Sequence, residues 1–259
     1  VNDRRMIASV SVLARLVRWL EGWTLRTADL VFIDTERQRN SLINDYDLDD
    51  NRLIEVPVGI DESLWQPLPP ALQRNPFTAL FWGTFIPLHG VETVVRAAHI
   101  LQAEHPDIRI ELVGDGQTAD AVASLIEELQ LTNVHWTRSL LPGAELRSRL
   151  ESAHCVLGIF GASDKAGNVI PYKAYQALAS NRVLITRKSP AFTDLLGSES
   201  VPGLLLVPSS DPEALAIAIA DLHEHYSDIY QKVATRELYD RCLGVGTVRK
   251  RVAEGVARL

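Results

Sequence analysis

Two lysines near the start of an expected helix are the residues of this sequence best suited to bind an anion. Lys165 and Lys173 lie on either side of Pro171, which stands at the expected first position of that helix. Free N–H groups at a helix N-terminus attract negative charge, and nearby cations add to the attraction. This combination suits a diphosphate. Two solvated surface lysines are the alternative interpretation.

Glycine turns after two expected strands add weaker evidence for a ligand site. Gly83 lets the backbone approach a ligand closely after the first strand, and Gly90 opens the following helix. A second turn, Gly114 to Gly116, follows the next strand. Neither turn completes the dinucleotide pattern G-x-G-x-x-G, so a purely structural turn remains an equal alternative for each.

The elements that position these residues alternate regularly from residue 76 onward. Short apolar segments predict strands at 78–82, 108–113, 134–137, 155–160, 183–186 and 204–207. The segments between them predict helices near 90–105, 117–130, 142–152, 171–180, 190–196 and 211–225. This alternation is typical of an α/β fold with a doubly wound, parallel, six-stranded, Rossmann-like sheet. Ligands of such sheets bind at the carboxyl ends of the strands, where both lysines and both glycine turns fall.

The chain divides into four expected parts. Residues 1–60 predict the end of a truncated N-terminal domain, with a helix at 5–26, strands at 30–33 and 53–58, and a helix at 36–44. A linker is expected at 61–75, since residues 57–70 contain four prolines and a glycine. Residues 76–225 form the expected Rossmann-like domain. Further helices are expected over 226–259.

The helix expected at 5–26 has an apolar stripe and many cations. Met6, Val10, Leu13, Val17 and Leu20 recur at steps of four and three. Residues 1–26 contain five arginines and two acidic residues. Packing on its own domain is one interpretation, and peripheral contact with an anionic membrane is the other.

Composition excludes some classes of function. The formal net charge is −7, whereas nucleic-acid binding relies on positive charge, so the composition does not indicate a nucleic-acid-binding protein. Cys155 and Cys242 lie far apart, and no D-x-D run or His/Cys cluster is present, so no metal cofactor is expected. No signal peptide or membrane-spanning stretch is apparent, and a cytoplasmic location is expected.

Five segments, in this order and spacing, resemble the family 4 (group 1) retaining glycosyltransferases of GT-B fold. They are ADLVFIDTERQRNSLI, NRLIEVPVGIDESLW, LFWGTFIPLHGVETVVRAA, RIELVGDGQ and VIPYKAYQALASNRVLIT. The resemblance covers roughly residues 28–225, mostly the C-terminal, donor-binding domain of that family. It implies a transferase that moves a sugar from a nucleoside diphosphate sugar to a glycan or lipid-linked acceptor, with retention and without a cofactor. It also implies that acceptor and catalytic residues belong largely to the N-terminal domain, so the isolated chain is expected to be inactive.

The resemblance assigns roles to individual positions. The donor diphosphate is expected to contact the following residues: Gly83, Thr84, His89, Lys165 and Lys173. The donor sugar is expected near the loop of Asn168, Val169 and Ile170. The ribose and base are expected at Gln176, Gly114, Thr137 and Arg138.

The sequence departs from the family pattern where charge is expected. The family has Arg and Lys at the positions of Thr84 and His89, and two glutamates at the positions of Asn168 and Gln176. Helix termini alone would poorly replace two cations, so Lys165 and Lys173 are the expected substitutes. A variant enzyme is the first interpretation. A non-catalytic sugar-nucleotide-binding partner subunit and a nucleotide-sugar epimerase of the same fold are the alternatives.

Overall fold

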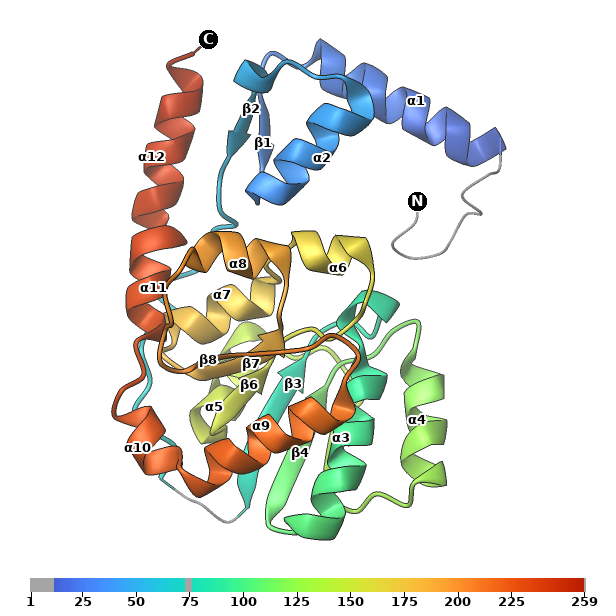
Figure 1. Ribbon diagram of the computed structural model, residues 1–259, viewed down its shortest axis with the longest axis vertical. Coiled ribbons are helices and arrows are strands. Elements are labelled where there is room, and N and C mark those ends of the chain that lie inside the picture. The colour runs from blue at the N-terminus through green and yellow to red at the C-terminus, as the bar shows by residue number, and fades with distance from the viewer. Residues whose placement is uncertain (1–11, 73–75, 259) are drawn as a thin grey trace.

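The computed structural model describes residues 12–72 and 76–258, which contain two separate parallel sheets (Figure 1). The smaller sheet pairs β1 (Val31–Ile33) with β2 (Leu53–Glu55). The larger sheet contains β3 (Phe77–Trp82), β4 (Ile108–Val113), β5 (Val134–Thr137), β6 (Cys155–Leu157), β7 (Val183–Arg187) and β8 (Leu204–Val207).

The larger sheet is doubly wound. Its strand order is β5-β4-β3-β6-β7-β8, and every neighbouring pair is parallel. The chain starts at β3, adds β4 and β5 on one side, and returns to add β6 on the other side. The order therefore reverses between β3 and β6, which is where such sheets bind ligands. The predicted α/β fold with a six-stranded parallel sheet is confirmed.

Helices cover both faces of the larger sheet (Figure 1). They are α3 (Val91–Glu104), α4 (Ala119–Glu128), α5 (Gly143–Ser152), α7 (Tyr172–Ala179), α8 (Pro190–Leu196) and α9 (Pro212–Glu224). The short helix α6 (Asp164–Asn168) lies beyond the carboxyl ends of the strands (Figure 1). Every residue of β3 is buried. Phe81 packs in the core cluster beneath α3 and α9, whereas Leu80 packs in the cluster beneath α7. Successive residues thus serve opposite faces, as expected for a strand.

The structure corrects the expected strand at 155–160. Strand β6 ends at Leu157. Gly158 and Ile159 still bond to the backbone of β7, but the Phe160 N–H donates to the His89 carbonyl and the Gly161 N–H to that of Leu88, so the chain leaves the sheet before residue 160. The helix α6 that follows was expected as loop. It has five residues and is capped by the Ser163 hydroxyl, and a helix this short shows no clear periodicity in the sequence.

The first described part packs against the end of the chain. Helix α1 (Val12–Thr27) is followed by β1, α2 (Glu36–Tyr46), the 3₁₀ turn η1 (Asp50–Arg52) and β2. Strand β2 was expected to continue to residue 58 but ends at Glu55. The start of the helix expected at 5–26 lies outside the described residues. Helices α10 (Tyr226–Tyr230), α11 (Thr235–Cys242) and α12 (Val245–Val256) close the chain, and α12 reaches back to β2 (Figure 1).

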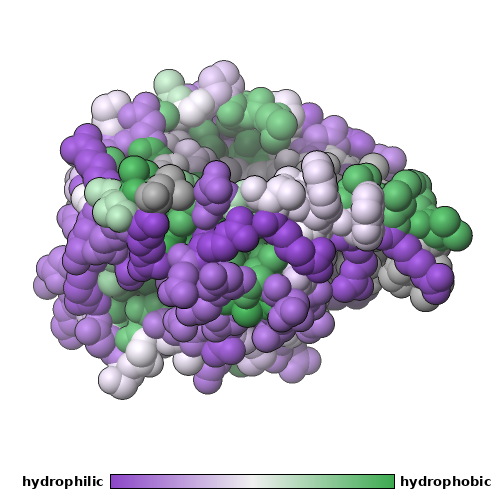
Figure 2. All heavy atoms as spheres, turned by 90° about the horizontal axis from the view of Figure 1, so that it is seen from above, coloured by the Kyte–Doolittle hydropathy of each residue, from purple (hydrophilic) through white to green (hydrophobic). Residues whose placement is uncertain are grey.

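One face of α1 carries large apolar side chains that the rest of the described chain leaves exposed. They are Val12, Leu13, Leu16, Trp19, Leu20 and Trp23. Viewed from above, hydrophobic surface gathers at the projecting end of this helix (Figure 2). The opposite side of α1 packs through Ala14 and Gly22. No helix among residues 12–72 and 76–258 combines the length and apolar composition needed to cross a membrane.

Candidate functional site

Two glycine turns touch at the carboxyl edge of β3 and β4. Gly83 and Gly114 have φ angles of 137° and 139°, a region that favours glycine. A Cβ atom on Gly114 would lie 1.9 Å from the Gly83 carbonyl oxygen. Only glycine therefore fits at position 114, and the two loops form one continuous backbone surface above the strands.

Lys173 is buried beneath this surface. Its side chain on α7 is 4% exposed, and its Nζ donates to the Gly158 carbonyl across 3.3 Å. Nζ also lies 3.5 Å from the centroid of the Phe81 ring. Burial lowers the pKa of Lys173 well below its ordinary value. The alternative interpretation of Lys173 as a solvated surface lysine is therefore wrong.

His89 approaches the same point from the other side of Gly83. It ends the 3₁₀ turn η2 (Pro87–His89), and its Nδ1 is buried without a hydrogen-bond partner. A Cβ atom on Gly83 would lie 3.2 Å from His89 Cε1 and 3.4 Å from Lys173 Nζ. The two side chains therefore converge closely on Gly83, which has no side chain of its own. Burial, and next the charge of Lys173, lower the pKa of His89 to about 3, so His89 is neutral at pH 7.

Lys165 lies in different surroundings. It is exposed on α6 and lines a cleft of about 710 Å³ between α6 and α2, together with Gln38, Asp45 and Asn168. Burial raises the pKa of Asp34 at the edge of β1, and the positive charge of Lys165 opposes that rise. Lys173 does not line this cleft. The two lysines therefore do not share it, in contrast to their expected common pocket.

The loop expected near the donor sugar joins the two sheets. The Asn168 carbonyl accepts a hydrogen bond from the Thr35 hydroxyl at 2.6 Å. Val169 packs against a small apolar cluster that contains Leu88, and Ile170 is buried in the larger cluster beneath α7. The apolar side chains of this loop thus fix its position.

Gln176 pairs with a residue of the central strand. The indole N–H of Trp82 donates to its Oε1 across 3.0 Å, and both side chains are buried. The expected contact between Gln176 and a ribose stays a prediction. A ribose at this position would contact the same side-chain amide of Gln176 that already accepts the hydrogen bond from Trp82.

Thr137 and Arg138, which are expected near the ribose and base, lie at β5, the edge strand of the sheet. Thr137 accepts the N–H of Gly114 on its carbonyl, which ties β5 to the second glycine turn. Arg138 forms ion pairs with Asp115 and Asp120. Thr84 lies in the first glycine turn and is exposed.

Arg187 is a site residue that the sequence analysis missed. It ends β7, is 8% exposed, and donates through Nη1 to the carbonyls of Gly161 and Ser163. Its Nε is buried without a partner. Arg187 therefore fixes the loop that leads into α6. The sequence did contain a signal for this role, which is an arginine at the end of an apolar strand.

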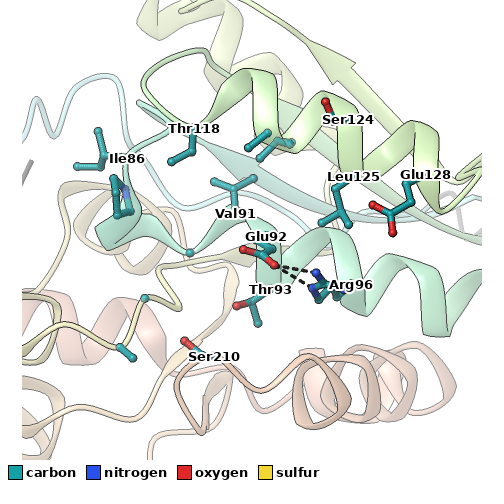
Figure 3. A pocket seen from close by; sticks show the side chains of 16 residues that line it. Ile86, Val91, Glu92, Thr93, Arg96, Thr118, Ser124, Leu125, Glu128 and Ser210 are labelled. Carbon is teal, nitrogen blue, oxygen red and sulfur yellow. Dashed lines mark hydrogen bonds and ion pairs between the residues drawn. The ribbon is translucent and has the colours of Figure 1, made fainter. Parts of the chain in front are cut away.

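A second cleft of about 540 Å³ lies between α3 and α4 (Figure 3). Gly90 and Gly161 are among the residues that line it. Glu92 and Arg96, which form an ion pair, line it as well (Figure 3). Neither Lys165 nor Lys173 lines it. This cleft is therefore separate from the surroundings of both lysines.

Known proteins similar to this chain share both its sequence pattern and its fold. The family described as "Glycosyl transferases group 1" matches residues 76–225. The "MMP alpha-(1->4)-mannosyltransferase" of Mycolicibacterium hassiacum is 26% identical over 180 residues, which cover 69% of this chain and 41% of that protein. The "D-inositol 3-phosphate glycosyltransferase" of Kineococcus radiotolerans is 24% identical over 225 residues, covering 78% of this chain and 51% of that protein.

Among solved structures, the fold of Anabaena Alr3699/HepE in complex with UDP is similar. Its TM-score is 0.77 at 16% identity, covering 99% of this chain and 71% of that chain. The TarM structure from S. aureus in complex with UDP and other ligands has a TM-score of 0.74 at 15% identity, covering 91% of this chain and 46% of that chain. This chain spans 36% to 51% of the length of the curated relatives that it matches.

Proposed function

Because the chain belongs to the group 1 glycosyl transferases, we propose that it binds a nucleoside diphosphate sugar as the donor part of a glycosyltransferase. The sugar passes to an acceptor with retention of its anomeric configuration, in the assembly of a glycan or polysaccharide. Similar folds have been solved with UDP, which supports a nucleotide donor.

The observation that carries this proposal is the buried cation beside Gly83. Lys173 has no carboxylate partner among the described residues, although burial of an unpaired charge is costly. Its amine adjoins Gly83, which has no side chain, and His89, whose Nδ1 is buried without a hydrogen-bond partner. A diphosphate oxygen supplies the missing negative partner for Lys173.

The proposed site acts on the leaving group. Negative charge grows on the diphosphate as its bond to the sugar breaks, and a fixed donor in a dry site stabilises that charge strongly. Lys173 supplies the cation, and Thr84 supplies a hydroxyl from the exposed side of the loop. His89 is held neutral and offers a ring nitrogen rather than a charge. No metal is required in this scheme.

A second candidate is a sugar-nucleotide-binding subunit without catalysis. The neutral state of His89 favours this candidate. The family pattern has two cations, Arg and Lys, at the positions of Thr84 and His89, and here Lys173 alone replaces them. Both candidates bind the donor, so only turnover separates them.

We propose that the acceptor is bound by parts of the protein outside this chain, and that α1 contributes a peripheral contact with an anionic membrane through its apolar face and its arginines.

Calorimetry with UDP tests the donor site directly. The chain should bind UDP, and Lys173→Met should weaken binding by about 1.5–3 kcal/mol, the value of a hydrogen bond to a charged group. Lys232→Met, at an exposed lysine after α10, is the matched control and should bind as the unchanged chain does. Absence of UDP binding, or equal affinity in both variants, contradicts the proposed site. Sugar transfer by the full-length protein, lost in Lys173→Met, distinguishes the enzyme from the subunit.

A further inference from the structure

Thr35 connects the first described part of the chain to the segment that follows β6. The residue is 4% exposed and is the N-cap of α2. Its hydroxyl oxygen accepts the N–H of Gln38 at 3.2 Å, and the same hydroxyl donates to the Asn168 carbonyl at 2.6 Å. The first bond caps the start of α2, and the second bond reaches the end of α6, 133 positions away in the sequence. One buried hydroxyl therefore serves both helices.

Helix α6 depends on contacts of this kind. It has five residues, so its own hydrogen bonds do little to stabilise it. Asn168 is its last residue, and the last carbonyl groups of a helix have no partner within the helix. At the opposite end, the Ser163 hydroxyl caps α6, and Arg187 donates to the Ser163 carbonyl. Thr35 thus fixes the end of α6 that leads into α7.

The segment between β6 and α7 borders both Lys173 and the cleft of about 710 Å³. At its start, the Gly158 carbonyl accepts the hydrogen bond from Lys173 Nζ. Further along, residues 162–165 and Asn168 line the cleft against α2. The segment follows the strand at which the order of the sheet reverses, and doubly wound sheets bind their ligands beside that point.

The walls of this cleft contain the groups that bind a sugar. Helix α2 contributes an amide, a hydroxyl and a carboxylate, and α6 contributes a second amide and a cation. These side chains belong to Gln38, Ser41, Asp45, Asn168 and Lys165. Sugar hydroxyls both donate and accept hydrogen bonds, so they pair with groups of both kinds.

We propose that Thr35 is a positioning residue for the donor sugar, because its hydroxyl fixes the distance between α6 and α2 across the cleft that takes this sugar. The inference rests on the proposed donor site. It adds that a donor with its diphosphate at Lys173 places its sugar between α2 and α6. Thr35 does not line the cleft. It therefore acts through Asn168 and contacts no ligand itself.

Calorimetry with and without the sugar tests this role. UDP ends at the diphosphate, whereas UDP-glucose and UDP-N-acetylglucosamine extend it by a sugar, and the probe is whichever of these two the unchanged chain binds more tightly. Thr35→Val removes the hydroxyl and keeps the shape of the side chain. It should bind UDP as the unchanged chain does and bind the UDP-sugar about fivefold more weakly, the equivalent of one hydrogen bond.

Two further variants separate the hydroxyl from the fold. Thr35→Ser keeps both hydrogen bonds and should bind both ligands as the unchanged chain does. Thr35→Gly also lacks the hydroxyl, but glycine at an N-cap costs a helix little stability. It should therefore repeat the selective loss of UDP-sugar affinity, including the case in which Thr35→Val does not fold.

Arg37 provides the matched control on the same helix. Its guanidinium joins α2 to α8 through two hydrogen bonds to the Asp194 carboxylate, at 2.6 and 3.0 Å. Arg37→Met removes this contact between the same two parts of the chain and leaves the bond to Asn168 in place. Both affinities should therefore equal those of the unchanged chain.

The outcomes separate this inference from the proposed function. A loss confined to the UDP-sugar in Thr35→Val and Thr35→Gly, with Thr35→Ser and Arg37→Met unchanged, supports it. Equal losses for UDP and the UDP-sugar, or the same selective loss in Arg37→Met, show general loosening and overturn it. Unchanged affinities in Thr35→Val and Thr35→Gly, or binding of UDP and neither UDP-sugar by the unchanged chain, overturn it and leave the diphosphate site standing. No UDP binding by the unchanged chain overturns both proposals.

Discussion

The indole N–H of Trp82 donates a hydrogen bond to Oε1 of Gln176 across 3.0 Å, although 94 positions separate the two residues. The bond joins the last residue of β3 to the middle of α7. These elements carry Gly83 and Lys173, so the pair fixes the distance across the proposed diphosphate site. Both residues are buried, which makes the bond difficult to replace with water.

Replacing Gln176 should therefore lower stability. Gln176→Leu leaves the buried indole N–H without an acceptor, and the free energy of unfolding should fall by about 1–3 kcal/mol. Urea unfolding measures this change. In the double variant with Trp82→Phe the donor is also gone, so the combined loss should be smaller than the sum of the two single losses. Strict additivity would show that the bond contributes nothing.

The same residue should also affect the donor. If the ribose contacts Gln176 as the family resemblance implies, Gln176→Ala weakens UDP binding by about 1 kcal/mol, the usual net value of a neutral hydrogen bond. Calorimetry on the folded variant tests this. An unchanged affinity would limit Gln176 to its bond with Trp82.

Lys173→Met should make the ligand-free chain more stable while it weakens UDP binding. In the native state burial lowers the pKa of Lys173, whereas the unfolded chain has an ordinary lysine. Below the unfolded pKa the unfolded state binds the extra proton, so this lysine lowers stability at pH 7 and does so less as pH rises. A rise in Tm of a few degrees, about 1 kcal/mol, is expected for a chain of this size. A lower Tm at pH 7 would contradict the lowered pKa of Lys173.

His89 should make the chain sensitive to acid. Its native pKa is about 3 because of burial and the charge of Lys173, whereas an unfolded histidine titrates near about 6.5. Below pH 6.5 the unfolded state binds one more proton. The free energy of unfolding therefore falls as pH falls toward 3, by about 1.4 kcal/mol per pH unit from this residue.

His89→Asn removes this dependence. Between pH 7 and pH 5 the variant should lose about 2 kcal/mol less stability than the unchanged chain in urea unfolding. His135→Asn, at an exposed histidine of β5, is the control and should behave like the unchanged chain. Parallel pH profiles for all three proteins would show that His89 titrates normally.

The exposed apolar face of α1 should drive self-association. Trp19 is 62% exposed and Trp23 is 57% exposed on the same side of the helix, and contiguous patches of this kind commonly bind other surfaces. Light scattering should show masses above that of one chain as the concentration rises. Trp19→Lys combined with Trp23→Lys should restore the mass of a single chain. Ile217→Lys, at an isolated exposed residue of α9, should not. A single-chain mass at all concentrations would contradict this prediction.

The sequence predicted the larger sheet well because its signal is local. Each strand of a parallel sheet is buried on both faces, so it appears as a short apolar run between amphipathic helices. All six runs became strands of one sheet. Helix α6 was missed because it has five residues and depends on a single Ser163 cap.

The sequence could predict where in the fold the candidate site lies, but not the surroundings of its side chains. The sequence alone determined that glycine turns and lysines follow the strands at the carboxyl edge of a doubly wound sheet. It gave the same weight to Lys165 and Lys173, because residue type and spacing do not reveal burial. Tertiary packing decided that Lys165 is exposed beside α2, whereas Lys173 is enclosed by Phe81, His89 and Gly158. Desolvation by those distant segments sets the charge state of a side chain, so the folded chain alone decides that His89 is neutral and that Lys173 lacks an ionic partner.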